Sequence, residues 1–327
     1  IKCNYIALLE KTKLLLANHC FIFISMKNQL EFDVIIVGGS YAGLSAAMAL
    51  GRSLRNVLVI DGGQPCNRQT PHSHNFLTQD GRTPREIALV GKEQVLRYET
   101  VRFLEDMAVS GRKTATGFEI DTQSGETHTA RKLILATGLR DRMSDIPGFA
   151  ECWGISVVHC PYCHGYEYHG QPTGILADGE AAYHYAQLVA NLTDKLLILT
   201  NGNASFTPEQ AARLAKNNIP VVEKEISYLD YDHGLIHRVV FKDGSDIPLK
   251  AIYSGLPNEQ HSGIPEKLGC ALNERGLITV DVMQKTTVEG VFAAGDNSSM
   301  FRSVASAVAT GNLAGAACNK YLTEEDF

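Results

Sequence analysis

The most reactive arrangement in this sequence is a pair of cysteines separated by two residues. Cys160 and Cys163 stand in the stretch Cys-Pro-Tyr-Cys-His-Gly-Tyr-Glu. We expect them at the start of a helix, where the helix dipole stabilises a thiolate on the first sulfur. A thiolate attacks a disulfide, and the second thiol then resolves the mixed disulfide. The spacing therefore predicts a redox-active thiol pair.

Histidines beside the pair leave its chemistry open in two respects. His164 could return a proton to a leaving thiolate, because imidazole titrates near neutral pH, or it could only hydrogen-bond its own turn. A structural zinc site with His159 and His164 competes with the redox interpretation, as does an inert buried pair. Zinc usually needs two ligand pairs, and no second Cys-x-x-Cys occurs. We therefore predict no metal.

A long loop, residues 62–81, carries further polar candidates. It is rich in Gly, Pro, Asn and His and lacks the period of a helix or strand. Cys66 could be an auxiliary thiol, and His72 and His74 could approach a cofactor. A lone loop cysteine and loop histidines are more often incidental, so we keep these three as reserve candidates.

A glycine-rich turn near the N-terminus predicts a dinucleotide site. The turn follows the apolar strand expected at residues 31–37 and opens a helix expected at residues 44–50, where a pyrophosphate can sit on free N–H groups. Asp61 ends the next expected strand about 20 residues later, where an acid can bind the adenosine ribose. The residues of the turn are Gly38, Gly39, Ser40, Tyr41, Ala42 and Gly43, with Ser40 at the usual second glycine.

The strand–helix–strand pattern occurs twice. A second copy is expected as a strand at residues 172–177, a helix at 180–192 and a strand at 195–200. A final helix, expected at about residues 302–321, is rich in Ala, Ser and Gly, which allows a neighbouring helix or a flat cofactor to come close. The predicted fold is α/β, with two Rossmann-like, three-layer nucleotide-binding domains, the second inserted into the first.

Composition narrows the class of protein. The chain has 327 residues, and its formal charge of -6 makes nucleic acid an unlikely main partner. No apolar run reaches the roughly 20 residues that span a bilayer. The sparse cysteines favour a reducing cytoplasm. The first 25 residues loosely imitate a signal peptide, but polar residues interrupt the apolar run, so we predict that residues 1–29 form an extension outside the core fold.

The order of four motifs carries a resemblance to a known family. The glycine turn, Ala136-Thr137-Gly138, the cysteine pair and Ala293-Ala294-Gly295-Asp296 follow one another along the chain. In this register the chain resembles the low-molecular-weight thioredoxin reductases, a flavoprotein family, over about residues 31–323. The resemblance implies a homodimer with an FAD-binding domain of residues 30–143 plus 256–327. An inserted NAD(P)H-domain-like unit, residues 144–255, would carry the cysteine pair.

The resemblance also implies roles for individual residues. Cys163 would face the flavin, and Cys160 would attack the substrate. Arg302, Ser303 and Val304 would place a helix N-terminus near the flavin ring, where its dipole stabilises a reduced, anionic flavin. The other residues implied to lie against FAD are those of the glycine turn together with Asn75, Ala108 through its backbone, Thr137, Gly138 and Asp296.

Three departures from the family bear on function. His164 replaces the usual acid after the cysteine pair, a form more like the dithiol oxidases that close disulfides in natural products. Ser303 replaces a usual Gln. The turn expected to hold NADPH reads Ala-Asp-Gly-Glu-Ala-Ala at residues 177–182, where two carboxylates would repel a pyrophosphate. Residues 200–203 supply no cation for a 2'-phosphate, so the use of NADPH or NADH stays open.

Three functions remain on these grounds. The favoured one is a thioredoxin reductase-like enzyme that passes electrons through FAD and the cysteine pair to a thioredoxin-like protein or a small disulfide. Its donor would be a nicotinamide, a ferredoxin or another reduced protein. The second is an oxygen-dependent oxidase of small dithiols that forms peroxide. The third, a flavin redox sensor without turnover, is disfavoured because both cysteines are retained.

Overall fold

The first of two large sheets contains the glycine turn. In the computed structural model, which describes residues 31–327, its strands run in the order β3-β2-β1-β6-β5-β4, and β17 also pairs with β6. Strands β1, β2, β3, β17 and the second half of β6 are parallel, whereas β4, β5 and the first half of β6 are antiparallel. The strands are β1 (Phe32–Val37), β2 (Val57–Ile60), β3 (Val101–Leu104), β4 (Ala108–Lys113), β5 (Phe118–Thr122), β6 (Thr127–Leu135) and β17 (Val291–Ala293).

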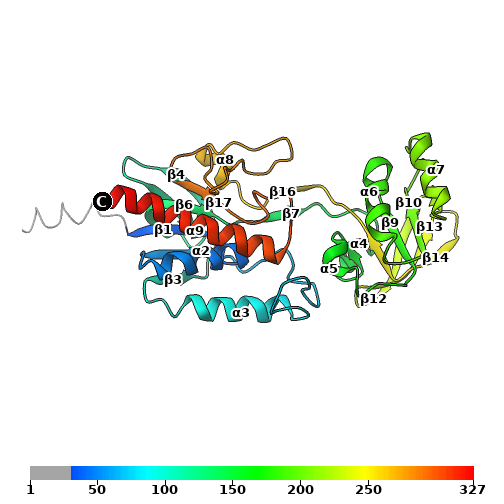
Figure 1. Ribbon diagram of the computed structural model, residues 1–327, viewed down its shortest axis with the longest axis horizontal. Helices are drawn as coiled ribbons and strands as arrows, with labels where there is room; N and C mark the ends of the chain where they lie inside the picture. The colour runs from blue at the N-terminus through cyan, green and yellow to red at the C-terminus, as the bar shows by residue number, and fades with distance from the viewer. Residues whose placement is uncertain (1–30) are drawn as a thin grey trace, which may run out of the picture.

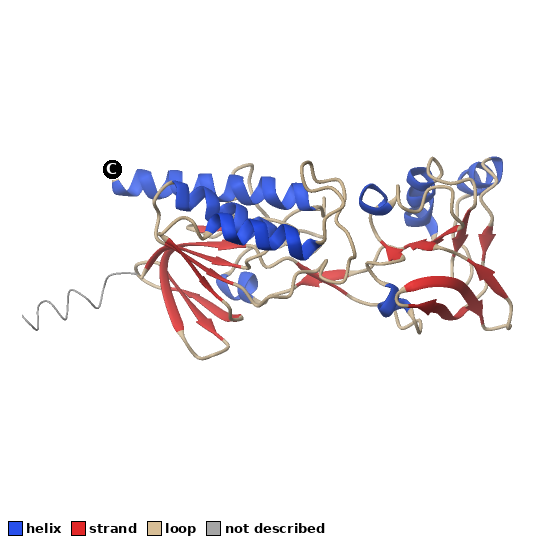
Figure 2. Cartoon of the chain, turned by 90° about the horizontal axis from the view of Figure 1, so that it is seen from below, coloured by secondary structure: helices blue, strands red, loops and turns tan. Residues whose placement is uncertain are grey.

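Apart from Asp33, strand β1 is apolar because both of its faces are buried. Val34 and Ile36 pack in the layer that contains α2 (Tyr41–Arg52) and α9 (Val304–Asp326). Ile35 and Val37 pack on the opposite face, with residues of β5, β6 and α8 (Ile264–Leu268). Figures 1 and 2 show the long C-terminal helix running along the helical face of the sheet. A further helix, α3 (Pro84–Val95), begins at a capping box on Thr83.

Two glycines let α9 lie directly on α2. A Cβ on Gly311 would lie 2.1 Å from the Ala42 carbonyl oxygen, and one on Gly315 would lie 2.6 Å from that of Ala46. The close neighbour of the predicted small-residue helix is therefore helix α2. The predicted ends of this helix, residues 302 and 321, were wrong by a few residues, since α9 spans Val304–Asp326. The helix begins at Val304 because the Ser303 side chain caps it by accepting a hydrogen bond from the Ser306 amide.

The second large sheet is parallel and belongs to the insert. Its strand order is β11-β10-β9-β15-β8, with α6 (Gly179–Val189) and α7 (Pro208–Lys216) packed on one face. An antiparallel sheet of β12, β13 and β14 packs on the other face, together with α4 (Phe149–Cys152). The strands are β8 (Val157–Val158), β9 (Thr173–Leu176), β10 (Leu196–Leu199), β11 (Val221–Val222), β12 (Ile226–Asp232), β13 (Leu235–Phe241), β14 (Asp246–Pro248) and β15 (Ala251–Tyr253).

A two-stranded antiparallel ribbon joins the two parts. Strand β7 (Leu139–Asp141) leads out of the first sheet, and β16 (Asn258–Gln260) leads back (Figure 1). The prediction of an α/β fold with Rossmann-like parallel sheets is confirmed. Across residues 31–327, we find no helix long and apolar enough to cross a membrane. The predicted extension at residues 1–29 lies outside the described residues.

Candidate active site

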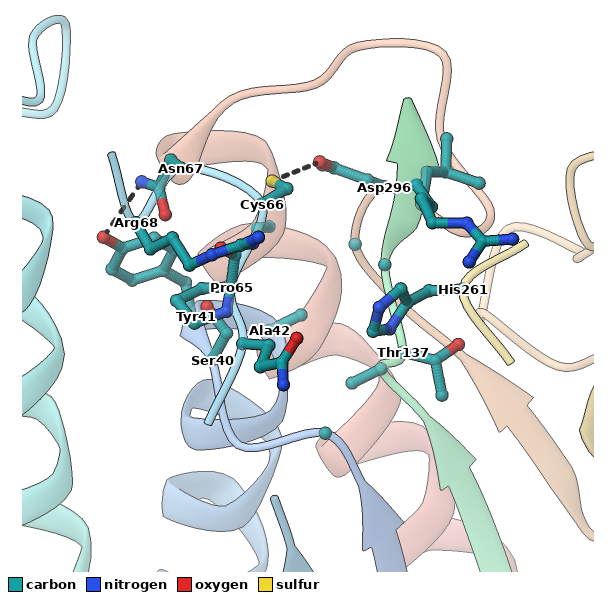
Figure 3. A pocket seen from close by; sticks show the side chains of 18 of the residues that line it. Ser40, Tyr41, Ala42, Pro65, Cys66, Asn67, Arg68, Thr137, His261 and Asp296 are labelled. Carbon is teal, nitrogen blue, oxygen red and sulfur yellow. Dashed lines mark hydrogen bonds between the residues drawn. The ribbon is translucent and has the colours of Figure 1, made fainter. Parts of the chain in front are cut away.

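A cavity of about 780 Å³ runs from the glycine turn to the cysteine pair. Its walls come from the β1–α2 turn, the loop after β2, the ends of β6 and β17, the start of α9 and the cysteine segment. Figure 3 shows side chains of the α2 turn and of the loop at residues 65–68 on one side, facing Thr137, His261 and Asp296. The volume lies within the range of about 300–1,000 Å³ typical of ligand and cofactor sites.

The glycine turn has no room for a side chain at Gly38 or Gly43. A Cβ on Gly38, whose φ is +106°, would lie 2.3 Å from the Ala136 carbonyl oxygen, and one on Gly43 would lie 1.8 Å from that of Gly38. Helix α2 starts at this turn, its N-cap Ser40 makes no side-chain capping bond, and its first turn holds no acid. The helix N-terminus is therefore open to an anion.

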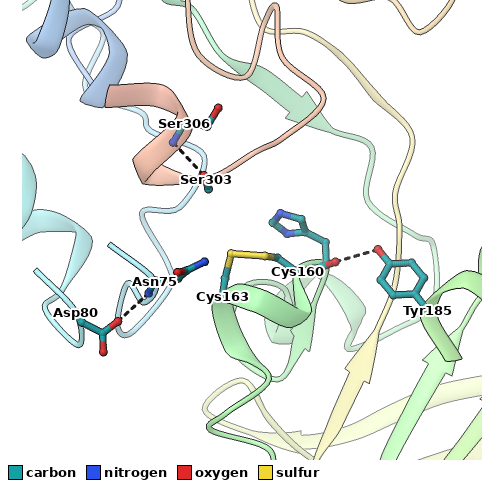
Figure 4. The surroundings of a disulfide bond; sticks show 8 residues. Asn75, Asp80, Cys160, Cys163, Tyr185, Ser303 and Ser306 are labelled. Carbon is teal, nitrogen blue, oxygen red and sulfur yellow. Dashed lines mark hydrogen bonds between the residues drawn. A yellow bond between two sulfur atoms is a disulfide. The ribbon is translucent and has the colours of Figure 1, made fainter. Parts of the chain in front are cut away.

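The cysteine pair is oxidised and lies at the other end of the cavity. Cys160 and Cys163 form a disulfide with a Cα–Cα distance of 5.3 Å. Cys160 is the N-cap of the short helix α5 (Pro161–His164), and Cys163 lines the cavity. Figure 4 shows this disulfide facing the N-terminal end of α9, where Ser303 lies. The predicted redox pair is thus next to the cofactor-sized cavity.

Comparisons with known proteins identify the family. The family model for pyridine nucleotide-disulphide oxidoreductases matches residues 32–311. This chain is a member of that family. The thioredoxin reductase tcpT of Claviceps purpurea is 35% identical over 86% of this chain and 92% of its own length.

Solved structures agree with this assignment. An oxidoreductase from Agrobacterium tumefaciens is 38% identical with a TM-score of 0.85, covering 90% of this chain and 99% of its own. A putative thioredoxin reductase from Bacillus anthracis is 32% identical with a TM-score of 0.86, covering 90% of this chain and 100% of its own. The protein is therefore an FAD-dependent disulfide oxidoreductase of the thioredoxin reductase-like kind.

The cavity fits the FAD that this family implies. The open N-terminus of α2 suits the pyrophosphate, because free N–H groups and the helix dipole favour an anion. Asp61 accepts a hydrogen bond of 3.1 Å from the Gly39 amide through one oxygen, which leaves the other available to a ribose hydroxyl. When bound, FAD would exchange an electron pair with the cysteines next to it.

Most residues expected to contact FAD do line this cavity. They are Gly38, Gly39, Ser40, Tyr41, Ala42, Asp61, Ala108, Thr137, Gly138, Asp296, Arg302, Ser303 and Val304, joined by Cys163 and His164. Gly43 does not line it and instead lets α2 pack against the turn. Asn75 is also outside the lining, in a left-handed conformation with its amide bonded to Asp80. Figure 4 shows its side chain near Cys163.

Arg302 is engaged by carboxylates. Its guanidinium donates to Asp141 of β7 at 2.6 and 3.1 Å and lies 3.5 Å from Asp296. Burial raises the pKa of Asp296, although Arg302 opposes the shift. The Cys66 sulfur lies 3.7 Å from Asp296, and burial followed by this carboxylate raises the pKa of the Cys66 thiol to about 11. Cys66 is therefore a protonated thiol at neutral pH.

Three histidines line the same cavity as Cys163. His74, His159 and His164 all line the cavity. Burial, with smaller contributions from His159 and His74, lowers the pKa of His164 to about 4. His164 is therefore a neutral imidazole at pH 7 and only a weak base. His74 reaches across to the insert, with its Nε2 3.4 Å from a carboxylate oxygen of Glu167.

Sequence reasoning did not identify several lining residues. Asp141, Trp153, His159 and His261 line the cavity although no motif marks them as cofactor residues. The one available signal was the position of His159 next to Cys160. Within residues 31–327, no three His, Cys, Asp or Glu side chains converge as a metal site would require.

The second nucleotide turn is occupied by the protein itself. Asp178 is the N-cap of α6, and its carboxylate accepts hydrogen bonds from the Ser205 amide at 2.9 Å and the Ser205 hydroxyl at 2.5 Å. Glu180, in the first turn, accepts a bond of 2.7 Å from the Gln210 side chain. Two carboxylates and the Ser205 loop therefore lie at the helix end where a pyrophosphate would bind.

Proposed function

We propose that this protein oxidises substrate dithiols to disulfides and passes the electrons through its cysteine pair and FAD to oxygen. The main support for this proposal is the second nucleotide turn, where Asp178 and Ser205 cover the N-terminus of α6. A nicotinamide donor would have to bind there against two carboxylates. Electrons entering from substrate thiols need no such site. The overall reaction converts a dithiol and oxygen into a disulfide and hydrogen peroxide.

The cysteines would act in a fixed order. A substrate thiolate attacks the Cys160 sulfur, the Cys160–Cys163 bond breaks, and Cys163 departs as a thiolate into the cavity. The second substrate thiol then attacks the sulfur joined to Cys160, which releases the substrate disulfide and the Cys160 thiolate. FAD, held next to Cys163 by the residues that line the cavity, would supply the acceptor for the electron pair of the reduced cysteines, with oxygen as the final oxidant. His164, neutral at pH 7, can hydrogen-bond the substrate thiol or the departing Cys163 sulfur.

The reductive direction is the second candidate. The similarity to the thioredoxin reductase of Claviceps purpurea supports it. In that case a nicotinamide, a ferredoxin or another reduced protein would supply electrons. The cysteine pair would then reduce a thioredoxin-like protein or a small disulfide. A homodimer and a cytoplasmic location are predictions for either direction.

One titration separates the two directions. Purified holoprotein is mixed anaerobically with NADPH, NADH or a small dithiol, and flavin absorbance is followed. We expect bleaching by the dithiol alone, and oxygen uptake with peroxide formation once air is admitted. Cys163→Ser is the control, because it keeps the FAD site but removes the exchange partner. Fast bleaching by NADPH or NADH, with no oxygen uptake on dithiols, would refute the oxidase and favour the reductase.

A further inference from the structure

Few polar contacts join the insert to the rest of the chain outside the β7–β16 ribbon. Among residues 31–327, no hydrogen bond links residues 144–255 to the remainder of the molecule apart from those within that ribbon. One carboxylate–histidine contact in this part of the chain adds to it, between Glu167 and His74, 3.4 Å apart. The position of Cys163 at the cavity therefore depends strongly on the direction in which the ribbon leaves the first sheet.

The ribbon is stiffened by charges on its exposed face. Successive side chains of a strand point to opposite faces, so Arg140 and Arg142 share one face of β7. Both bind Glu259 of β16, and the Nε atom of each arginine lies 2.9 Å from a carboxylate oxygen. Isolated surface ion pairs contribute little, but two arginines on one carboxylate form a network that resists sliding of the two strands. Fixing one residue of the ribbon therefore fixes the whole ribbon.

On its other face, the ribbon is anchored through Asp141. The Arg302 guanidinium donates to both oxygens of this carboxylate, at 2.6 and 3.1 Å, which is the bidentate geometry that fixes direction as well as distance. Both side chains are buried, with 7% of Asp141 and 15% of Arg302 exposed. Burial alone would lower the pKa of Arg302, but the hydrogen bond and charge of Asp141 outweigh it and raise that pKa. The pair stays ionised, and separating it would leave two buried charges uncompensated.

Arg302 connects this anchor to the helix end that faces the disulfide. It directly precedes Ser303, the N-cap of α9, and Figure 4 shows Cys163 facing that end of the helix. Asp141 is the last residue of β7 and lies just before the insert begins. One buried ion pair thus joins the base of the insert to the part of the first unit that its disulfide must meet.

We propose that Asp141 and Arg302 are positioning residues whose ion pair sets the direction of the ribbon and thereby keeps Cys163 turned toward the cavity that holds FAD. They act through the ribbon and not on the reacting atoms. The role requires FAD in the cavity but holds for either direction of electron flow, so it does not depend on the oxidase proposed above.

The accessibility of the two thiols in reduced holoprotein tests this role. Cys163 lines the cavity and Cys160 does not, so bound FAD should shield Cys163 and leave Cys160 as an internal reference. Holoprotein in excess FAD is reduced anaerobically with a phosphine and treated with iodoacetamide, and alkylation of each cysteine is followed by mass spectrometry. In Asp141→Asn, we expect the rate at Cys163 relative to Cys160 to rise about tenfold, because the insert is turned away from the cavity more often. Asp141→Glu, which keeps the carboxylate, should restore most of the shielding.

Asp33→Asn is the matched control for a purely structural role. Asp33 pairs with Arg131 at 3.3 Å near the start of β1, at the end of the first sheet opposite the ribbon. Its loss should lower stability without changing the Cys163-to-Cys160 ratio. An unchanged ratio in folded Asp141→Asn, or an equal rise in Asp33→Asn, would assign the pair to general stability and overturn the proposal. If Asp141→Asn does not fold, Glu259→Gln decides, because it loosens the exposed face of the ribbon and should raise the same ratio by a smaller factor; no rise would count against the proposal.

Discussion

Removing the two carboxylates of the second nucleotide turn should strengthen the response of the flavin to NADPH. The double variant Asp178→Gly, Glu180→Ala leaves Gly179 at the start of α6 and frees the Ser205 loop from its hydrogen bonds to Asp178. Burial would raise the pKa of Asp178, but hydrogen bonds from Ser205 outweigh it and lower the pKa. The carboxylate is therefore ionised and repels a phosphate at neutral pH.

The size of the effect follows from the position of these carboxylates. Two unit charges 4 Å apart repel by about 1 kcal/mol in water and about 4 kcal/mol near a protein surface. Glu180 is exposed and Asp178 half-buried, so we take about 1.4 kcal/mol for each. That amounts to about tenfold in nucleotide affinity for each carboxylate, or about a hundredfold for the pair.

The assay is anaerobic bleaching of the flavin across a range of NADPH concentrations. We expect the double variant to reach half-saturation at about one hundredth of the wild-type concentration, if the wild type responds at all. Glu209→Ala, which removes an exposed acid from the first turn of α7, should leave the response unchanged. Wild-type bleaching at the same low NADPH concentration as the double variant would refute the argument that these residues close the donor site.

Three other predictions concern the cofactor end of the molecule. Gly39→Ala should strongly reduce bound FAD, because its Cβ would lie 2.5 Å from Phe103 and 2.7 Å from Asp61. Gly255→Ala, outside the cavity lining and with no atom nearer than 3.4 Å to its Cβ, should retain it; flavin absorbance per protein measures both. Asp141→Ala should lower the unfolding free energy of apoprotein by about 3 kcal/mol in denaturant titration, because Arg302 loses its closest partner. Between pH 7 and pH 5, the unfolding free energy of wild-type apoprotein should fall by about 2 kcal/mol more than that of the His164→Gln apoprotein. The reason is that His164 takes up a proton near pH 6.5 in the unfolded chain, whereas burial keeps it neutral in the folded protein down to about pH 4. Equal losses in the two proteins would contradict this.

Local sequence signals predicted the parts of the fold that depend on neighbouring residues. The apolar run at residues 31–37 predicted a strand, which is β1, and the glycine turn predicted a helix after it. That helix was expected at residues 44–50, and α2 begins earlier, at Tyr41. The spacing of Cys160 and Cys163 predicted a disulfide, and the structure has one. In each case the information lies within a few residues, because turn sterics and ring closure are local constraints.

Residues brought in by distant pairing could not be predicted in the same way. His159 reaches the cavity because β8 pairs with β15 far along the chain, Val157 opposite Ile252. Arg302 meets Asp141 across 161 positions. No local period or motif encodes either contact, since each depends on the register of strands that close only in the folded protein. The placement of Asn75 and the other expected FAD contacts against a bound cofactor is still a prediction.

The insert shows how a nucleotide-binding fold can persist after its nucleotide turn has changed. The parallel sheet and α6 depend on a cluster of buried apolar side chains that includes Ile175, Ala186 and Ala182 of the turn, but not the turn's two acids, Asp178 and Glu180. The same sheet also carries β8, whose end leads into His159 and the cysteine pair. Loss of the sheet would therefore misplace the disulfide, whereas loss of the turn affects only a donor. Selection for dithiol oxidation would preserve the sheet but not the nucleotide turn, and this chain has an intact sheet with an altered turn.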